Sequence, residues 1–195
     1  MKIIIASDLH GSAKWCAELL SAYDRENAEL LLLCGDILYH GPRNPLPDDY
    51  SPMKVVELLT RIKDKIICVC GNCDSEVDRM VLPFEMYCKH LPYETGRRGS
   101  PSVCVNSVFI YLDHGHYPAP YLPEGAVYIT GHTHVPLNVK ENGYYHLNPG
   151  SVSLPKENSP HSYILFTQSY PDGGVFEFKD FNGNVFDKLV LDVKA

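Results

Sequence analysis

The sequence predicts an α/β protein in which two mixed sheets pack together with helices outside, a four-layer α-β-β-α sandwich. Two observations carry this prediction. In the first half of the chain, short apolar runs alternate with segments of helical spacing, the pattern of a βαβαβ unit with parallel strands. In the second half, short strands follow one another between turn signals. With 195 residues and no repeat, linker or break in composition, we expect a single domain over residues 1–195.

The first half is expected to hold three buried strands with helices between them. Wholly apolar runs favour strands that are covered on both faces, and they lie at residues 2–7, 30–34 and 65–70. Ser12 is positioned to cap a helix over Ala13–Tyr23, and Pro52 to stand in the first turn of a helix that continues to Ile62. A short helix is expected over Ser75–Val81.

The second half is expected to be rich in strands. Asn142-Gly143 is a type I′ hairpin signal between two of them, and Asn182-Gly183 predicts a second hairpin. An exposed turn is expected over Glu94–Ser100. The predicted strands are Met86–Leu91, Ser102–Val105, Val108–Asp113, Val127–Thr130, Asn138–Glu141, Tyr144–Leu147, Tyr163–Thr167, Val175–Lys179 and Val185–Val193.

Composition excludes several classes of protein. The net charge of −7 argues against a stable nucleic-acid partner bound through a basic face. No apolar stretch approaches the length of a membrane span, and the first residues lack the features of a signal peptide, so we expect a cytoplasmic protein without a membrane partner. Four of the seven cysteines lie in apolar runs and are interpreted as small buried side chains in a reducing compartment: Cys16, Cys34, Cys68 and Cys70.

Polar side chains follow the apolar runs at the points where the strands should end. Because the carboxyl ends of parallel strands form the ligand-binding edge of an α/β sheet, these side chains are expected to meet. In extended chain, residues i and i+2 point the same way, so Asp8 with His10, and His132 with His134, should each present two groups to one cavity. The candidate ligands are Asp8, His10, Asp36, Asn72, His114, His132 and His134.

A mixed set of carboxylate, imidazole and amide ligands suits Mn²⁺, our first expectation, or Fe²⁺, Zn²⁺ or Ni²⁺. Seven candidates are too many for one tetrahedral ion. Two ions about 3.5–4 Å apart that share a carboxylate account for the number. Asp36 follows the middle strand and is best located to bridge them.

The order and spacing of these residues resemble the motifs of the calcineurin-like metallophosphoesterases, over residues 1 to about 155. The matching blocks are Asp8-Leu-His10, Gly35-Asp36, Gly71-Asn72, His114 and Gly131-His-Thr-His134. Further detail in Ser7–Gly11, His40–Asn44, Gly71–Glu76 and Asn148–Ser153 resembles the small bacterial phosphodiesterases of the YfcE type.

The resemblance implies a role for each ligand. Asp8, His10 and His134 would hold one metal ion, Asn72, His114 and His132 the other, and Asp36 would bridge them. A hydroxide shared by the two ions would then attack phosphorus in line, with Asp36, Asn72 and His114 at the catalytic centre. The substrate expected is a small or activated phosphodiester, and the resemblance leaves a homo-oligomer open.

Four further residues are candidates near this centre. The stretch Tyr39–Pro52 carries four of the fifteen prolines and predicts a loop over the site, from which Arg43 would contact phosphate. His116 would orient a ligand or touch phosphate. Most of the wider family has histidine where this chain has Cys73, so efficient action on poorly activated esters is in doubt. Asp74 follows and would orient a group at position 73.

Two other functions remain as alternatives. A catalytically silent protein-interaction scaffold with the same fold is the first, and the four histidines of the metal motifs argue against it. A nuclease of the same superfamily is the second, and the short acidic chain argues against that.

Overall fold

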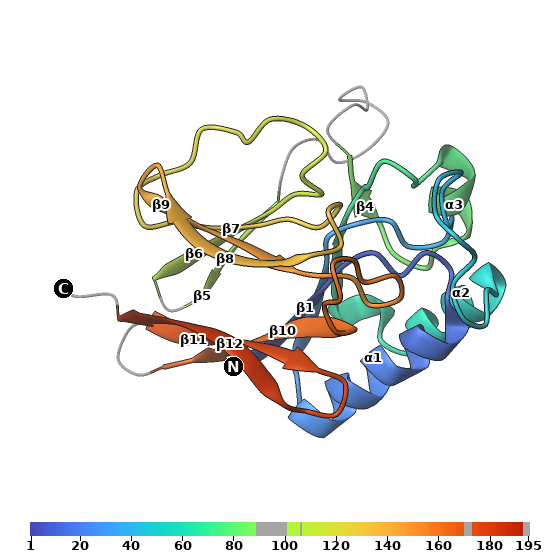
Figure 1. Ribbon diagram of the computed structural model, residues 1–195, viewed down its shortest axis with the longest axis horizontal. Coiled ribbons are helices and arrows are strands. Elements are labelled where there is room, and N and C mark those ends of the chain that lie inside the picture. The colour runs from blue at the N-terminus through green and yellow to red at the C-terminus, as the bar shows by residue number, and fades with distance from the viewer. Residues whose placement is uncertain (89–100, 106, 170–172, 193–195) are drawn as a thin grey trace.

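The computed structural model describes residues 1–88, 101–105, 107–169 and 173–192. Its two β-sheets pack face to face, and helices cover the outer side of the larger sheet (Figure 1). The fold class predicted from the sequence, an α/β sandwich of two mixed sheets, is confirmed.

The larger sheet has seven strands in the order β12-β11-β10-β1-β2-β3-β4. Strands β1 to β4 run parallel to one another, and the three C-terminal strands are antiparallel additions beside β1. Their bounds are β1 Lys2–Ala6, β2 Leu30–Leu33, β3 Ile66–Val69, β4 Met86–Tyr87, β10 Ser162–Gln168, β11 Gly173–Asp180 and β12 Val185–Asp192.

The smaller sheet has five strands in the order β5-β6-β7-β9-β8, of which β6, β7 and β9 are parallel. Both residues of Asn142-Gly143 have positive φ, as the predicted type I′ turn between β8 and β9 requires. The bounds are β5 Ser102–Val105, β6 Val108–Leu112, β7 Val127–Ile129, β8 Pro136–Glu141 and β9 Tyr144–Pro149.

The helices begin where the sequence predicts. Helix α1 (Ala13–Glu26) is capped by the Ser12 hydroxyl, which accepts a hydrogen bond from the backbone N–H of Trp15. Helix α2 (Pro52–Thr60) has its proline in the first turn, and α3 (Glu76–Val81) opens with a capping box. A short 3₁₀ turn, η1 (Lys63–Lys65), leads from α2 into β3.

Alternation along β1 divides the core into two layers. Ile4 and Ala6 belong to the cluster that packs against the helices, whereas Ile3 and Ile5 belong to the cluster between the sheets. Both faces of this strand are therefore buried, which explains its continuous apolar sequence. Helices α1 and α2 bury side chains against the outer face of the seven-stranded sheet, whereas α3 has no buried residue. Leu122 and Ala126, which precede β7, pack on the outer face of the smaller sheet instead.

The structure differs from the sequence prediction at the strand that begins at Met86 and at Cys70. The strand predicted over Met86–Leu91 ends at Tyr87 as far as the chain is described, and the turn predicted over Glu94–Ser100 lies outside the described residues. Cys70, expected as an unpaired buried thiol, forms a disulfide with Cys88, so that expectation is wrong. The two residues follow the adjacent parallel strands β3 and β4, which brings their Cα atoms to 5.0 Å from each other.

No described helix is long and apolar enough to cross a membrane.

Candidate metal centre

The predicted ligands come from strand ends of both sheets. Asp8, Asp36 and Asn72 follow the parallel strands β1, β2 and β3 of the larger sheet. His114 and His132 follow β6 and β7 of the smaller sheet. The site therefore lies where the carboxyl ends of parallel strands from the two sheets meet.

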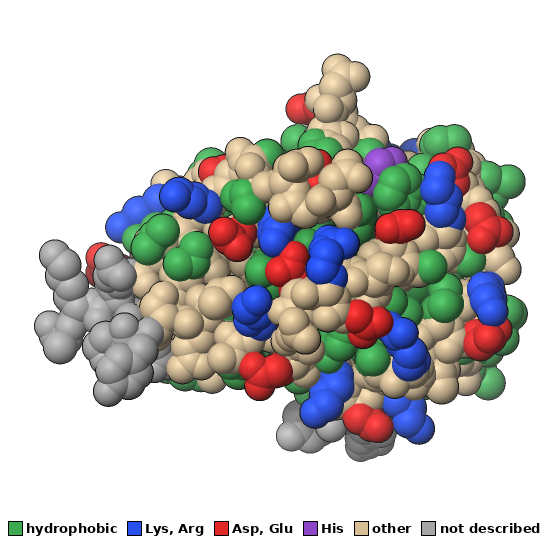
Figure 2. Space-filling model, turned by 90° about the horizontal axis from the view of Figure 1, so that it is seen from below, with side chains coloured by type: hydrophobic (Ala, Val, Ile, Leu, Met, Phe, Trp, Pro, Cys, Tyr) green, Lys and Arg blue, Asp and Glu red, His purple; other side chains and the backbone are tan. Residues whose placement is uncertain are grey.

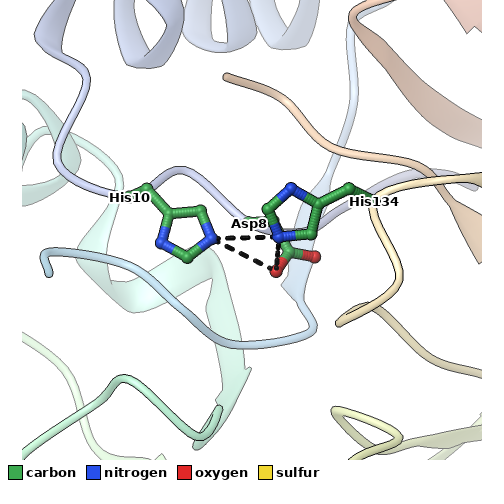
Figure 3. A group of neighbouring side chains, drawn as sticks. All are labelled: Asp8, His10 and His134. Atoms are coloured by element: carbon green, nitrogen blue, oxygen red, sulfur yellow. Dashed lines mark hydrogen bonds and ion pairs between the residues drawn. The ribbon is translucent and has the colours of Figure 1, made fainter. Parts of the chain in front are cut away.

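Asp8, His10 and His134 form the first group, and their ligand atoms all lie within 4.8 Å of one another (Figure 3). The Nε2 atoms of the two histidines are 3.2 Å apart. Asp8 Oδ1 lies 3.6 Å from His10 Nε2 and 3.3 Å from His134 Nε2. All three side chains are almost completely buried.

The hydrogen bonds of this group leave electron pairs facing one another. His10 Nδ1 donates to the Tyr39 carbonyl at 2.8 Å and His134 Nδ1 to the Leu154 carbonyl at 2.6 Å, because a carbonyl oxygen can only accept. In the neutral tautomers, both Nε2 atoms are then acceptors. Asp8 Oδ2 accepts the His132 backbone N–H, while Asp8 Oδ1 has no hydrogen-bond partner. Three buried acceptors that converge without a donor fit a cation.

The second group contains Asp36, His114 and Asn72. His114 Nδ1 donates to the Cys34 carbonyl at 2.6 Å, and its Nε2 lies 3.0 Å from Asn72 Oδ1 and 3.4 Å from Asp36 Oδ2. When the ring is neutral, the Nε2 lone pair faces two oxygens, an arrangement that again fits a cation.

Asp36 lies between the two groups. Its Oδ1 accepts the backbone N–H of Cys73 at 2.8 Å, which fixes the carboxylate. Its Oδ2 is 3.4 Å from His114 Nε2 and 3.8 Å from His10 Nε2. One oxygen thus faces a histidine of each group, as a bridging carboxylate requires.

Five of the seven predicted ligands have left-handed backbone conformation, with φ between 48° and 68°: Asp8, His10, Asp36, His132 and His134. The expectation of extended chain at the pairs Asp8/His10 and His132/His134 is therefore wrong. His134 joins Asp8 and His10, whereas the His132 ring lies beside that of His114, with centroids 5.2 Å apart. Such conformations are uncommon outside glycine and concentrate at functional sites.

Asp74 joins the turns after β2 and β3. Its carboxylate accepts hydrogen bonds from the backbone N–H groups of Asp36 (2.8 Å), Ile37 (2.9 Å) and Gly71 (2.6 Å). That Asp74 also orients a group at position 73 stays a prediction. Burial and the Asp36 charge raise the pKa of Asp74 to about 6.

Cys73 lies on the cleft side of this turn. Its sulfur accepts a hydrogen bond from Asn72 Nδ2 at 3.2 Å, which turns Asn72 Oδ1 toward His114. Burial and the carboxylates of Asp36 and Asp74 raise the pKa of the Cys73 thiol to about 12.

The carboxylates and imidazoles shift one another's pKa. Burial alone would raise the pKa of Asp8, but the neighbouring imidazoles of His10, His134 and His114 hold it well below its usual value. Burial would likewise lower the pKa of His114. The hydrogen bond and charge of Asp36, together with the charge of Asp8, raise it to about 9. The carboxylates of Asp8 and Asp36 thus carry more negative charge than neutral imidazoles can balance. This excess of negative charge favours a bound cation.

A cavity of about 890 Å³ opens over the site, and the loop after Asp36 forms one wall. Arg43 lines it, and its contact with phosphate stays a prediction. Lys156 lines it as well, and the sequence did not indicate this because the residue is 120 positions from Asp36 and belongs to no motif. The His116 ring contacts that of His114, with ring centroids 5.2 Å apart. Burial and the neighbouring His114 and His132 lower its pKa to about 4.

Two packed mixed sheets with a carboxylate–histidine centre at their strand ends define a metallophosphoesterase-type fold. A family model for the calcineurin-like phosphoesterase superfamily domain matches residues 1–169. The chain belongs to this superfamily and is a phosphoric ester hydrolase.

Individual relatives agree with the family assignment. Phosphodiesterase YfcE of Escherichia coli K12 is 40% identical over 167 residues, which cover 84% of this chain and 85% of YfcE. A solved structure of YfcE, a phosphoesterase from E. coli, superposes with a TM-score of 0.86 at 35% identity, over 98% of this chain and 100% of that one. Zinc-bound Vps29 of Entamoeba histolytica shares the fold, with a TM-score of 0.61 at 17% identity, over 97% of this chain and 99% of Vps29.

Proposed function

We propose that this chain is a dinuclear-metal phosphodiesterase that hydrolyses a small or activated phosphodiester by in-line attack of water at phosphorus. The likeness to phosphodiesterase YfcE supports the reaction class. The observation that carries the metal mechanism is the convergence of buried acceptors on both sides of Asp36 Oδ2.

The residues present fit two divalent ions. Asp8, His10 and His134 would hold one, and His114, Asn72 and His132 the other, with Asp36 shared. When bound, such ions lower the pKa of a coordinated water and neutralise charge on the phosphoryl oxygens. Among the candidate metals, Mn²⁺ is our first choice, and we place the enzyme in the cytoplasm.

The chain's own side chains prepare the site for an anionic substrate. The carbonyls of Tyr39, Leu154 and Cys34 fix the imidazole tautomers, so that every Nε2 lone pair points inward. Arg43 and Lys156 line the cavity and supply positive charge for a phosphodiester group. His116 packs against the His114 ring and would limit its movement.

Two measurements on one preparation test this proposal. We expect the purified protein to bind two divalent ions per chain and to hydrolyse an aryl phosphodiester with Mn²⁺, and we expect the activity to vanish on chelation and return on adding Mn²⁺. The matched control is Asp64→Asn, which changes an exposed carboxylate in η1.

Full turnover after exhaustive chelation would overturn the metal mechanism. Bound metal without hydrolysis of any phosphodiester would instead favour the catalytically silent scaffold.

A further inference from the structure

A third group of potential ligands lies on the cleft side of the centre. One ring nitrogen of His10, one carboxylate oxygen of Asp36 and Cys73 Sγ all lie within 4.8 Å of one another. His10 Nδ1 is occupied by the Tyr39 carbonyl, so Nε2 is the nitrogen available to an ion. Asp36 Oδ1 accepts the Cys73 N–H, so Oδ2 is the available oxygen.

The sulfur is held in place and can be reached by a solute. Asn72 Nδ2 donates to it at 3.2 Å, and a methyl group on the opposing Gly41 would come within 2.9 Å of it. Cys73 and Asp36 both line the cavity of about 890 Å³. The described free cysteines differ from Cys73 in this respect: Cys16, Cys34 and Cys68 are buried in the core and Cys104 is exposed elsewhere.

We propose that Cys73 is an additional ligand that makes the position of His10 and Asp36 selective for thiophilic cations. Thiolate, imidazole and carboxylate together suit Zn²⁺ or Cd²⁺, whereas Mn²⁺ prefers oxygen and nitrogen ligands. On binding, the S–H bond of Cys73 breaks, its proton passes to the solvent, and a sulfur–metal bond forms. The sulfur then occupies a coordination position on the cleft side of the ion, so a thiophilic ion is retained more tightly and leaves less room for substrate.

Cadmium is a suitable probe because cadmium–thiolate bonds have an ultraviolet charge-transfer absorption. Metal-free wild type, Cys73→Ser and Cys104→Ser are titrated with Cd²⁺ without thiol reductant, which keeps the Cys70–Cys88 disulfide closed. Mn²⁺ affinity of the same three proteins is measured by the resonance signal of free Mn²⁺. Cys104→Ser is the matched control because it removes an exposed thiol.

We expect wild type and Cys104→Ser to show the absorption and Cys73→Ser to lose it, with Cd²⁺ affinity lowered about tenfold or more. Mn²⁺ affinity should change less than about twofold, since its preferred ligands remain. Absorption that persists in Cys73→Ser would overturn the proposal. Equal losses of Cd²⁺ and Mn²⁺ affinity would also overturn it, because they would show that the serine disturbs Asn72 rather than removing a ligand.

This inference rests on the metal-binding part of the proposed function and not on turnover. If wild type binds neither ion, both fail together. If both ions bind and position 73 has no effect on either, only this inference fails.

Discussion

At the scale of single residues, the identity of the ligands could be predicted but their backbone could not. Asp8, Asp36 and His134 stand directly after apolar runs and short glycine motifs, which the sequence displays. Their positive φ angles are uncommon outside glycine, and no local pattern in the sequence indicates them. His132 and His134 nevertheless line one cavity, as predicted, and His134 faces His10, as the family resemblance implies.

Replacing the shared carboxylate of Asp36 should lower metal content and kcat more than the replacement of any other single ligand. Asp36→Asn removes a negative charge that faces both groups, so we expect loss of metal from both positions and a fall in kcat of about 10²-fold or more. His134→Ala should affect mainly one ion. Metal content and kcat at saturating Mn²⁺ measure the difference. Near-normal kcat with two ions in Asp36→Asn would show that Asp36 is not the bridge.

Metal binding should depend on pH through His114. Its pKa of about 9 means that the metal-free ring carries a proton at neutral pH, which an ion must displace. Affinity should therefore rise with pH and level off above about pH 9. Calorimetric titrations in buffers of different ionisation enthalpy give the number of protons released. If the number of protons released per ion does not decrease as the pH is raised from 7 to 10, this assignment is contradicted.

Position 73 should set the preference for leaving groups. A thiol is a weak donor without charge at neutral pH, whereas an imidazolium donates strongly. Cys73→His should therefore gain activity on alkyl or nucleotide esters, within the range of about 10²–10⁴-fold typical of general acids, and gain little on aryl diesters. Asp74 already accepts three backbone hydrogen bonds, which leaves little acceptor capacity for orienting the new ring. Equal changes in kcat/KM on both substrates would refute the idea.

At the scale of elements, the sequence predicted the helices and most strands because their signals are local. Ser12 and Pro52 mark helix starts, and Asn142-Gly143 marks a hairpin. The contacts between turns were not predictable in this way. Asp74 joins two turns through three hydrogen bonds, and a Cβ atom on Gly71 would overlap the Asp36 carboxylate. Both facts depend on the spacing between β2 and β3.

The Asp74 contact should contribute measurably to stability. Asp74→Asn places an amide NH₂ among buried backbone donors, and leaving one N–H unsatisfied costs about 1–3 kcal/mol. We expect Asp74→Asn to unfold at a lower urea concentration than wild type. Its metal affinity should also be lower, since Asp74 joins the turns that carry Asp36 and Asn72. Asp78→Asn is a control in the exposed capping box of α3. Similar midpoints for Asp74→Asn and wild type would contradict this role.

At the scale of the whole molecule, the class of fold followed from a change in the hydrophobic pattern along the sequence. Strands alternate with helices in the first half of the chain and follow one another in the second half. The covering of the smaller sheet did not follow from it, because in the described residues its outer face packs against irregular chain around Leu122. Charge is also distributed without a simple pattern: Figure 2 shows Lys and Arg interspersed with Asp and Glu over the described part of the face seen there.

The metal ions should hold the two sheets together. His134 comes from the smaller sheet, and Asp8 and His10 from the larger one, so an ion bound by all three links them. Ligands that bind only the folded state add about 2.7 kcal/mol at a hundredfold excess over Kd. We therefore expect Mn²⁺ to raise Tm by several degrees and chelation to reverse this. In Asp36→Asn the rise should be smaller; an equal rise would show that the ion stabilises the protein elsewhere.

The separation of His10 and His134 by 124 residues also determines when the site can form during synthesis. A ribosome that has released only the first βαβαβ segment presents Asp8, His10 and Asp36, without the imidazoles of the smaller sheet. The His134 ring also needs the Leu154 carbonyl to fix its tautomer. The group of Asp8, His10 and His134 can therefore be completed only after Leu154 has emerged, so this metal position forms late in synthesis.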